Sequence, residues 1–226
     1  MNQLRVELFG GFRVSVDGHS VDEAAWRRRK PAALIKLLAL APSHRLHREA
    51  IMDALWPDLD PDAAGANLRK ALHHARRALD ESMPSSGALI ASDADQIVLA
   101  PGALWLDAEQ FRTDLASARR SGDPEIYREA IERYGTGLLP EDRFEDWAVA
   151  PRDELQRDCF AALEELARLL EARGELDAAV EVARQLVAAD PLREESHAAL
   201  IRLCALAGRR AEALRCYERL TELLRD

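Results

Sequence analysis

The chain has 226 residues, of which 48% are hydrophobic and 31% are charged, and its formal net charge at pH 7 is −9. This composition is typical of a chain that buries an apolar core, and it excludes a largely disordered protein. The absence of an 18-residue apolar run and of a signal-peptide pattern predicts a cytoplasmic protein without a membrane-spanning helix.

The N-terminus predicts short β-strands. In "LRVELFGGFRVSVDG", residues 4–18, apolar side chains alternate with polar ones on both sides of Gly10–Gly11. Alternation with period two, interrupted by glycines, is typical of strands. Asp17–Gly18 is a strong signal for a tight turn between two of them.

Three helices are predicted next. "WRRRKPAALIKLLALAP" has apolar residues at helical spacing, with Pro31 in its first turn and Pro42 as its stop. "LHREAIMDALWP", residues 46–57, has the same spacing. The third helix covers residues 61–81 and follows Asp60, which is the predicted N-cap.

A hairpin and a purely helical region complete the predicted elements. Two short apolar runs flank Ser92–Asp95 and predict a hairpin, and from about Trp105 onward the pattern predicts only helices. Gly174 and Gly208 are 34 residues apart, and each is followed five residues later by an alanine. This is the period of tetratricopeptide repeats, in which glycine occupies the turn between paired helices. A generic bundle of helical hairpins is the alternative.

The third predicted helix carries its basic side chains away from its apolar stripe. Leu68, Leu72, Ala75 and Leu79 form one stripe that must face a core. The major groove of B-DNA admits one α-helix, and basic or amide side chains bind base edges and phosphates there. A solvated basic face without a partner is the alternative. The polar side chains of this helix are Asn67, Arg69, Lys70, His73, His74, Arg76 and Arg77.

A second basic cluster, "RRRK", occupies Arg27–Lys30 at the start of the first predicted helix. Cations at a helix N-terminus oppose the helix dipole, so local stabilisation explains them poorly. An external polyanion, whose phosphates also accept hydrogen bonds from free helix N–H groups, explains them better. Surface arginines with solvated charges are the alternative.

The order of strands, three helices with a basic third helix, and hairpin resembles the OmpR/PhoB-type winged helix. "LRVELFGGFRVSVDG", "RRRKPAALIKLLALAP", "LHREAIMDALWPD", "NLRKALHHARRAL" and "GALWLDAEQF" resemble actinobacterial antibiotic-pathway regulatory proteins of the SARP type. The resemblance implies a mainly α chain with a winged helix-turn-helix domain at residues 1–104, which is α+β. An all-α, tetratricopeptide-like bacterial transcriptional activator domain at 105–226 is implied to follow.

The resemblance also implies a function and partners. It implies a transcription activator that binds direct repeats in double-stranded DNA near promoters through the helix at 61–81 and recruits RNA polymerase. Direct repeats imply head-to-tail protomers on DNA. In relatives the segment corresponding to Trp56–Asp60 contacts polymerase, although for Trp56 itself core packing is the favoured interpretation.

Roles are implied for individual residues as well. Base edges are the implied partners of Asn67, Lys70, His73 and His74. Phosphates are the implied partners of Arg76 and Arg77, with Arg69 on the flank of the same helix. The DNA backbone beside the groove is the implied partner of Arg28, Arg29 and Lys30.

The chain departs from the family pattern in two places. The hairpin tip carries Asp93 and Asp95, where winged relatives often have Arg or Lys, and this predicts a small contribution of the wing to DNA binding. His73 and His74 occupy positions where relatives tend to have arginine. Since neutral histidine lacks a full charge, DNA affinity is expected to be modest at pH 7 and to rise as the pH falls.

No enzymatic, metal or cofactor site is predicted. The sequence contains no GxGxxG, GxxxxGK[ST], HExxH or GxSxG motif, and Cys159, Cys204 and Cys216 form no CxxC pair. A zinc site from His44, His47 and His73 is disfavoured by their spacing. The cysteines are interpreted as buried, reduced thiols in helices.

The charge is unevenly distributed and supports two parts with different partners. Residues 1–105 carry 13 basic and 13 acidic side chains, whereas the rest carry 18 and 27. The acidic second part is interpreted as a protein-interaction domain with a partner that the sequence does not identify. Two alternatives to a DNA-binding activator stay open: a tetratricopeptide-type scaffold, and the N-terminal regulatory fragment of a larger regulator with nucleotide-hydrolysing modules.

Overall fold

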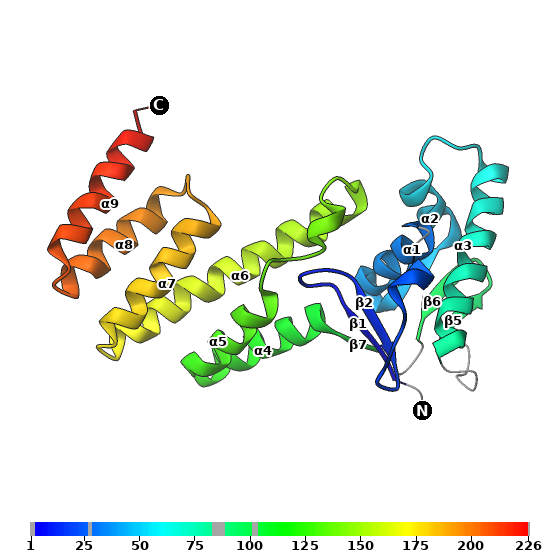
Figure 1. Cartoon of the computed structure of the whole chain (residues 1–226), viewed down its shortest axis with the longest axis horizontal. Helices are drawn as coiled ribbons and strands as arrows, with labels where there is room; N and C mark the ends of the chain where they lie inside the picture. The colour runs from blue at the N-terminus through cyan, green and yellow to red at the C-terminus, as the bar shows by residue number, and fades with distance from the viewer. Residues whose placement is uncertain (1–2, 27–28, 83–88, 101–103, 226) are drawn as a thin grey trace. The chain divides into compact units, whose positions relative to one another are not determined.

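The computed structural model describes residues 3–26, 29–82, 89–100 and 104–225. These residues form two compact units (Figure 1). Unit 1 consists of Met1–Gln110 and Gly135–Glu154, and unit 2 consists of Phe111–Tyr134 and Leu155–Asp226. No helix among the described residues is both long enough and apolar enough to cross a bilayer.

Unit 1 begins with a four-stranded sheet. Strand β1 pairs antiparallel with β2, with Leu4 opposite Val16, and parallel with β7. Asp17 and Gly18 both have positive φ, at 48° and 82°, and form the predicted tight turn. The strands, in order across the sheet, are β3 (His19–Ser20), β2 (Arg13–Val16), β1 (Leu4–Glu7) and β7 (Leu104–Leu106).

The winged helix of unit 1 consists of three helices and a second sheet of three strands. Helix α1 contacts α2, α3 and β6, and its Leu34, Ile35 and Leu38 are fully buried. The predicted hairpin is present as β5 and β6, and β6 also pairs antiparallel with β4. The elements are α1 (Arg29–Leu40), β4 (Arg45–His47), α2 (Arg48–Leu55), α3 (Pro61–Ser82), β5 (Ile90–Asp93) and β6 (Gln96–Leu99).

Two strands correct the sequence prediction. The prediction of helices only from Trp105 onward is wrong at its start, because Trp105 lies in β7 opposite Arg5. Leu46, predicted as the first apolar position of a helix, lies in β4 opposite Ile97, and α2 begins two residues later. Both strands have three residues, which is too short for period two to be distinguished from helical spacing.

A later part of the chain completes unit 1. The backbone N–H of Gly10 donates to the carbonyl of Gly137 at 3.0 Å, and that of Leu139 donates to the carbonyl of Leu8 at 2.9 Å. Lys36 of α1, only 6% exposed, forms ion pairs with Glu141 and with Asp142. These contacts hold the segment 135–154 in the same compact unit as the winged helix.

Asp107 also joins the N-terminal sheet to the chain that follows it. One carboxylate oxygen accepts hydrogen bonds from the backbone N–H groups of Leu8 and Phe9, at 2.7 and 2.8 Å. The other accepts one from Ala108 at 2.8 Å. Burial raises the pKa of Asp107 above its ordinary value, against the opposing effect of these hydrogen bonds.

The predicted domain boundary between residues 104 and 105 therefore falls within β7, a strand of the unit 1 sheet. Strand patterning in the sequence does not reveal that β7 belongs to this sheet, because β7 pairs with β1, about a hundred positions away. How function is divided between 1–104 and 105–226 stays a prediction.

Unit 2 is helical, and its turns confirm the predicted repeat. Gly122, Gly174 and Gly208 lie between α4 and α5, α6 and α7, and α8 and α9, with φ of 66°, 76° and 74°. Ala179 and Ala213, the alanines five residues after the second and third glycines, are buried. Helices α4 and α6 each have residues in both units. The helices are α4 (Asp107–Ser121), α5 (Pro124–Tyr134), α6 (Asp146–Ala172), α7 (Leu176–Ala189), α8 (Glu194–Leu206) and α9 (Arg210–Leu223).

Candidate nucleic-acid interface

Helix α3 begins where the sequence predicts. The carboxylate of Asp60 accepts hydrogen bonds from the backbone N–H groups of Asp62 at 3.1 Å and Ala63 at 3.0 Å. Pro61 is the first helical residue and lacks the N–H group that would otherwise need a partner at that position. The N-cap therefore fixes the direction in which the chain enters the helix.

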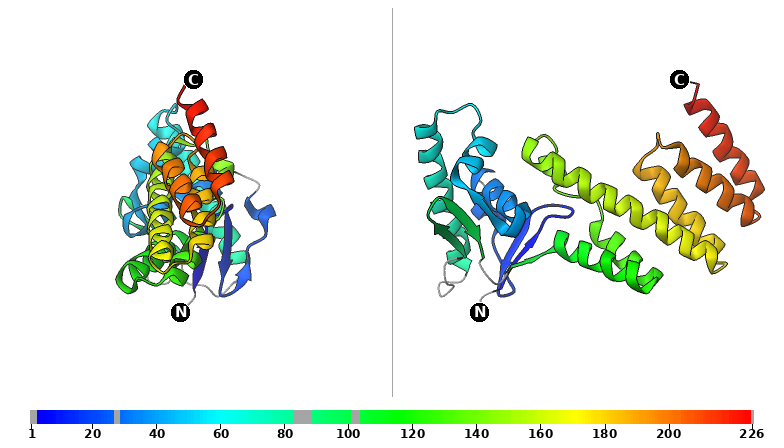
Figure 2. Two further views of the ribbon diagram at one scale, coloured as in Figure 1. Left: turned by 90° about the vertical axis from the view of Figure 1, so that its left-hand side faces the viewer. Right: turned by 180° about the vertical axis from the view of Figure 1, so that it is seen from behind.

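One side of α3 is held by the core of unit 1. Leu68, Leu72, Ala75 and Leu79 are each at most 4% exposed, and both α1 and α2 contact the helix. Figures 1 and 2 show α3 at the outer edge of unit 1, with its other side turned away from α1 and α2. The predicted apolar stripe is confirmed, and it determines which side chains can face a partner.

The solvent side of α3 brings together four of the predicted DNA-binding residues. Arg69, Lys70, His73 and Arg77 are exposed and lie within about 100° of one another around the helix axis. Asn67 and His74 are half-buried on one flank, and the His74 ring meets that of His73 edge to face, with centroids 5.5 Å apart. The four exposed residues span Arg69–Arg77, which is about two and a half turns of helix.

Arg76 lies on the opposite flank and has partners within the fold. Its Nε donates to the carbonyl of Ile90 at 3.2 Å, and a terminal nitrogen donates to the hydroxyl of Ser92 at 2.9 Å. Both partners belong to β5, so Arg76 joins α3 to the wing. Its predicted contact with phosphate is untested and stays a prediction.

The basic cluster before α1 is only partly described. Arg28 lies outside the described residues, and Arg29 is exposed at the start of α1. The ammonium group of Lys30 donates to the carbonyl of Leu55 at 2.7 Å, and it lies 5.9 Å from the centroid of the Trp56 ring. Lys30 thus places a positive charge at the C-terminal end of α2, where the helix dipole favours one.

The wing presents negative charge. Ser92, Asp93, Ala94 and Asp95 are exposed at the turn between β5 and β6, where Ala94 has φ of 47°. The carbonyl of Asp95 accepts a hydrogen bond from the N–H of Arg48 at 2.8 Å, which ties the turn to the start of α2. Because carboxylates repel phosphate, the wing is a less favourable surface for a polyanion than the basic face of α3.

Sequence reasoning did not single out two exposed residues, Arg45 and Leu59, although Leu59 lies within the predicted loop Trp56–Asp60. Arg45 is exposed on β4, a strand that the sequence pattern did not reveal. Leu59 is 43% exposed in the loop between α2 and α3, where Asp58 and Asp60 flank it. The exposure of Leu59 could have been predicted from the sequence. An apolar residue flanked by two aspartates and two prolines cannot belong to the apolar stripe of a helix.

A family match covers the second part of the chain. The model of the family described as bacterial transcriptional activator domain matches residues 106–226. The regulatory protein AfsR of Streptomyces coelicolor is 30% identical over 240 residues, which cover 99% of this chain and 22% of AfsR. The chain thus spans about a fifth of the length of that relative.

A solved structure shares the fold. EmbR of Mycobacterium tuberculosis, in complex with a low-affinity phosphopeptide, aligns with a TM-score of 0.78 and 20% sequence identity. The alignment covers all of this chain and 61% of the EmbR chain. At that identity the likeness concerns the fold alone, and it confirms the mainly α architecture with a small β region.

Proposed function

The chain belongs to the bacterial transcriptional activator domain family and is a SARP-type transcription regulator, and we propose that it binds double-stranded DNA through α3. The observation that carries the proposal is the exposed face of Arg69, Lys70, His73 and Arg77 on a helix whose opposite side is buried. A helix held in this way can enter the major groove without losing its support from the core.

The side chains of α3 divide into two kinds of contact. Lys70 and His73 are suited to hydrogen-bond acceptors on base edges, and Arg77 is suited to phosphate oxygens one turn further along the helix. Asn67 and His74, on the flank, extend the base-reading row. Arg29 supplies a further positive charge at the start of α1, and Lys30 supports the site from within by anchoring α2.

The chain is proposed to act on direct repeats as head-to-tail protomers, and to activate transcription by recruiting RNA polymerase. The loop Trp56–Asp60, which is exposed from Pro57 onward, is the proposed polymerase contact. Leu59 supports this role, because an exposed leucine flanked by aspartates offers an apolar centre with a polar rim, which is the usual anatomy of a protein interface.

The test of DNA recognition is the selection of bound duplexes from a random library with the full chain. We expect a motif of spaced direct repeats, and its loss in the Lys70→Ala/Arg77→Ala variant. The matched control is Arg119→Ala/Arg120→Ala, which removes the same charge from exposed positions of α4 and is expected to recover the same motif. Equal recovery from both variants, or no motif from the unmodified chain, contradicts the proposal.

The polymerase contact is tested separately, by transcription in vitro from a promoter that carries the selected motif. Leu59→Ala is expected to leave DNA affinity unchanged and to lower transcript yield several-fold. The control is Leu192→Ala, because Leu192 is 75% exposed in unit 2, against 43% for Leu59, and its truncation removes at least as much exposed apolar area. A yield that Leu59→Ala leaves unaltered contradicts this role of the loop.

A further inference from the structure

Helix α9 of unit 2 has two apolar sides, and one of them is exposed. Ala213, on the side that packs on α8, is buried. Leu214, Tyr217 and Leu224 are 54%, 57% and 54% exposed. At about 100° of rotation per residue, these three side chains lie within a sector of about 80° around the helix axis. They therefore form one continuous apolar row, the α9 stripe.

The repeat shows what covers the equivalent side of α7. Helices α7 and α9 follow glycine turns that are 34 residues apart, so Val180 and Ala183 of α7 correspond to Leu214 and Tyr217 of α9. Val180 and Ala183 are fully buried, and α7 packs on the next helix, α8. In Figures 1 and 2, α8 lies between α7 and α9, and no described helix lies against the far side of α9. The α9 stripe therefore occupies the position at which α7 contacts α8.

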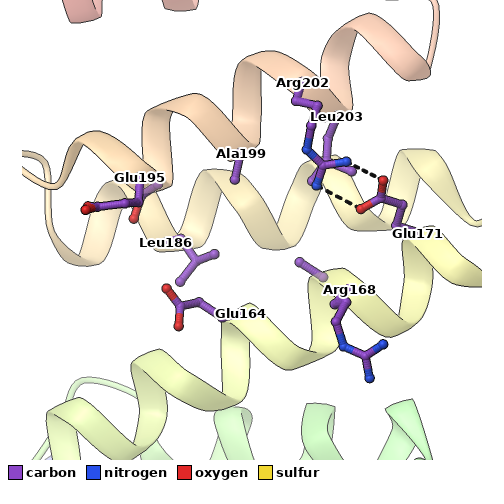
Figure 3. A pocket seen from close by; sticks show the side chains of 10 residues that line it. Glu164, Arg168, Glu171, Leu186, Glu195, Ala199, Arg202 and Leu203 are labelled. Atoms are coloured by element: carbon purple, nitrogen blue, oxygen red, sulfur yellow. Dashed lines mark hydrogen bonds and ion pairs between the residues drawn. The ribbon is translucent and has the colours of Figure 1, made fainter.

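The packing of α8 shows what a helix in this position contributes. Leu186 of α7 and Ala199 and Leu203 of α8 line the groove between α6, α7 and α8 (Figure 3). At the edge of this groove, the guanidinium of Arg202 in α8 donates to both carboxylate oxygens of Glu171 in α6. A helix that packs on the repeat thus combines an apolar row with charged side chains that find partners beside it.

The arginines beside the α9 stripe have no such partners. Arg210 lies one helical turn before Leu214, and Arg225 directly follows Leu224. Both arginines are exposed, and within the described part of the chain neither guanidinium has an ion-pair partner. Carboxylates of a bound helix would pair with them at the two ends of the stripe. The arginines of the preceding helices and turns that are paired with carboxylates are Arg184, Arg193, Arg202 and Arg209.

We propose that the α9 stripe binds an amphipathic helix of a partner protein, which has acidic residues beside its apolar row and packs on α9 as α8 packs on α7. The α9 helix of a second copy fits poorly, because it brings the same unpaired arginines to the contact. An anionic membrane fits poorly as well, because residues 106–226 carry 18 basic and 27 acidic side chains. This interaction is independent of the DNA binding proposed for α3.

The test measures the binding of two labelled peptides to the full chain by fluorescence anisotropy. The neutral peptide has the sequence of residues 191–207, which contain α8, with Cys204→Ala to prevent oxidation. The acidic peptide also has Arg193→Glu and Arg202→Glu. We expect both to bind, and the acidic peptide to bind about fivefold more tightly at low ionic strength, as two exposed ion pairs allow. Added salt is expected to reduce this preference.

The apolar part of the contact is located by Leu214→Ser/Tyr217→Ser, which is expected to weaken the binding of both peptides at least tenfold. The control is Leu192→Ser, because Leu192 is 75% exposed and lies outside α9, and this change is expected to alter neither affinity. Circular dichroism melting confirms that each variant is folded.

The charged part is located by Arg210→Ala/Arg225→Ala. This variant is expected to remove the fivefold preference for the acidic peptide and to leave the affinity for the neutral peptide unchanged. The matched control is Arg119→Ala/Arg120→Ala, which removes the same charge from exposed positions of α4 and is expected to keep the preference.

Several outcomes overturn the proposal. They are no binding of either peptide, binding that Leu214→Ser/Tyr217→Ser leaves unaltered, and a preference for the acidic peptide that survives Arg210→Ala/Arg225→Ala. A dimer of the unmodified chain in sedimentation that Leu214→Ser/Tyr217→Ser converts to a monomer assigns the stripe to a second copy instead. Binding to phosphatidylglycerol vesicles that the same variant abolishes assigns it to a membrane.

The fate of this proposal is separable from that of DNA recognition. Leu214→Ser/Tyr217→Ser is expected to select the same DNA motif as the unmodified chain, because both residues lie in unit 2 and α3 lies in unit 1. Loss of peptide binding with retention of the DNA motif supports the assignment of the partner helix to α9.

Discussion

Arg76 and Arg77 are adjacent on α3 but have different surroundings. Arg76 is half-buried and donates to the carbonyl of Ile90 and the hydroxyl of Ser92, whereas Arg77 is exposed on the proposed DNA-binding face. The same residue type therefore contacts the wing in one position and lies on the exposed face of α3 in the next. Their substitutions are expected to have different consequences.

Arg76→Ala is expected to lower the free energy of unfolding by about 1 kcal/mol, because two hydrogen bonds to a partly exposed charged donor are lost. Urea unfolding measures this effect. Arg77→Ala is expected instead to reduce the slope of log affinity against log salt concentration by about one, as the loss of one phosphate contact does. The assignment is contradicted if Arg76→Ala changes the salt slope and leaves the unfolding free energy unaltered.

The cysteines offer a second test at the scale of single residues. Burial raises the pKa of Cys159 to about 12, and burial also raises the pKa of Cys204. A thiol reacts as its thiolate, and with a pKa of about 12 roughly one Cys159 in ten thousand is ionised at pH 8. Cys216, in contrast, is only half-buried.

We therefore expect a thiol reagent such as DTNB to modify Cys216 alone in the folded protein at pH 8. Raising the pH from 7 to 9 should leave Cys159 unmodified, because its ionisation begins well above that range. In urea all three cysteines should react. The control is Cys216→Ser, which is expected to show no fast reaction in the folded state, and fast modification of Cys159 in that variant contradicts the prediction.

The turns between the helices of unit 2 depend on glycine for a reason of backbone geometry. Gly174 has φ of 76°, and a Cβ added there meets no atom within 4 Å among the described residues. The backbone N–H of Gly174 donates to the carbonyl of Glu171, and that of Glu175 donates to the carbonyl of Leu170. Both hydrogen bonds lie at the C-terminal end of α6. An L-residue is disfavoured here by its own backbone conformation and not by its neighbours.

Gly174→Ala is accordingly expected to lower the free energy of unfolding by about 1 kcal/mol. The matched control is Gly65→Ala within α3, where the added Cβ lies at ordinary contact distances of 3.6 and 3.8 Å from Arg69 and Met52. That change is expected to stabilise the protein by roughly 0.5–1 kcal/mol. Thermal melting of both variants checks the opposite signs, and two shifts in the same direction contradict the argument.

Patterns that repeat over many residues made most of the fold predictable from the sequence. The stripe of α3 and the glycine spacing of unit 2 follow from local chemistry repeated at a fixed period, and the cap at Asp60 follows from one local signal. Strand β7 was missed because its three residues are stabilised by pairing with β1, which is distant in the sequence. Local patterns contain no information about such a partner.

For the candidate site, the sequence predicts which residues of α3 are exposed but not their contacts with other elements. The buried stripe determines which side of α3 is exposed, so the positions of Lys70, His73 and Arg77 follow from the sequence. The contacts of Lys30 with Leu55, and of Arg76 with β5, do not follow, because each requires the packing of two elements to be known. Charge alone therefore identifies the cluster but not the role of each member.

At the scale of the whole molecule, unit 1 is assembled from two separate stretches of chain. The pairing of Lys36 with Glu141 and Asp142 places a cation that is 6% exposed against carboxylates more than a hundred residues away. The fragment 1–104 retains the cation and lacks both carboxylates and Asp107. An uncompensated buried charge costs about 3–5 kcal/mol, a large share of the roughly 5–15 kcal/mol by which domains are stable.

We expect the fragment 1–104 to unfold at a much lower urea concentration than unit 1 of the full chain. Tryptophan fluorescence measures this, because Trp26 and Trp56 are present in both the fragment and unit 1 of the full chain, and unit 2 has no tryptophan. Lys36→Met should recover part of the loss in the fragment, since it removes the unpaired charge, and should destabilise the full chain, because it leaves the Asp142 carboxylate, whose side chain is 11% exposed, without its cation. A fragment as stable as unit 1 contradicts the prediction and shows that the winged helix does not depend on residues 135–154.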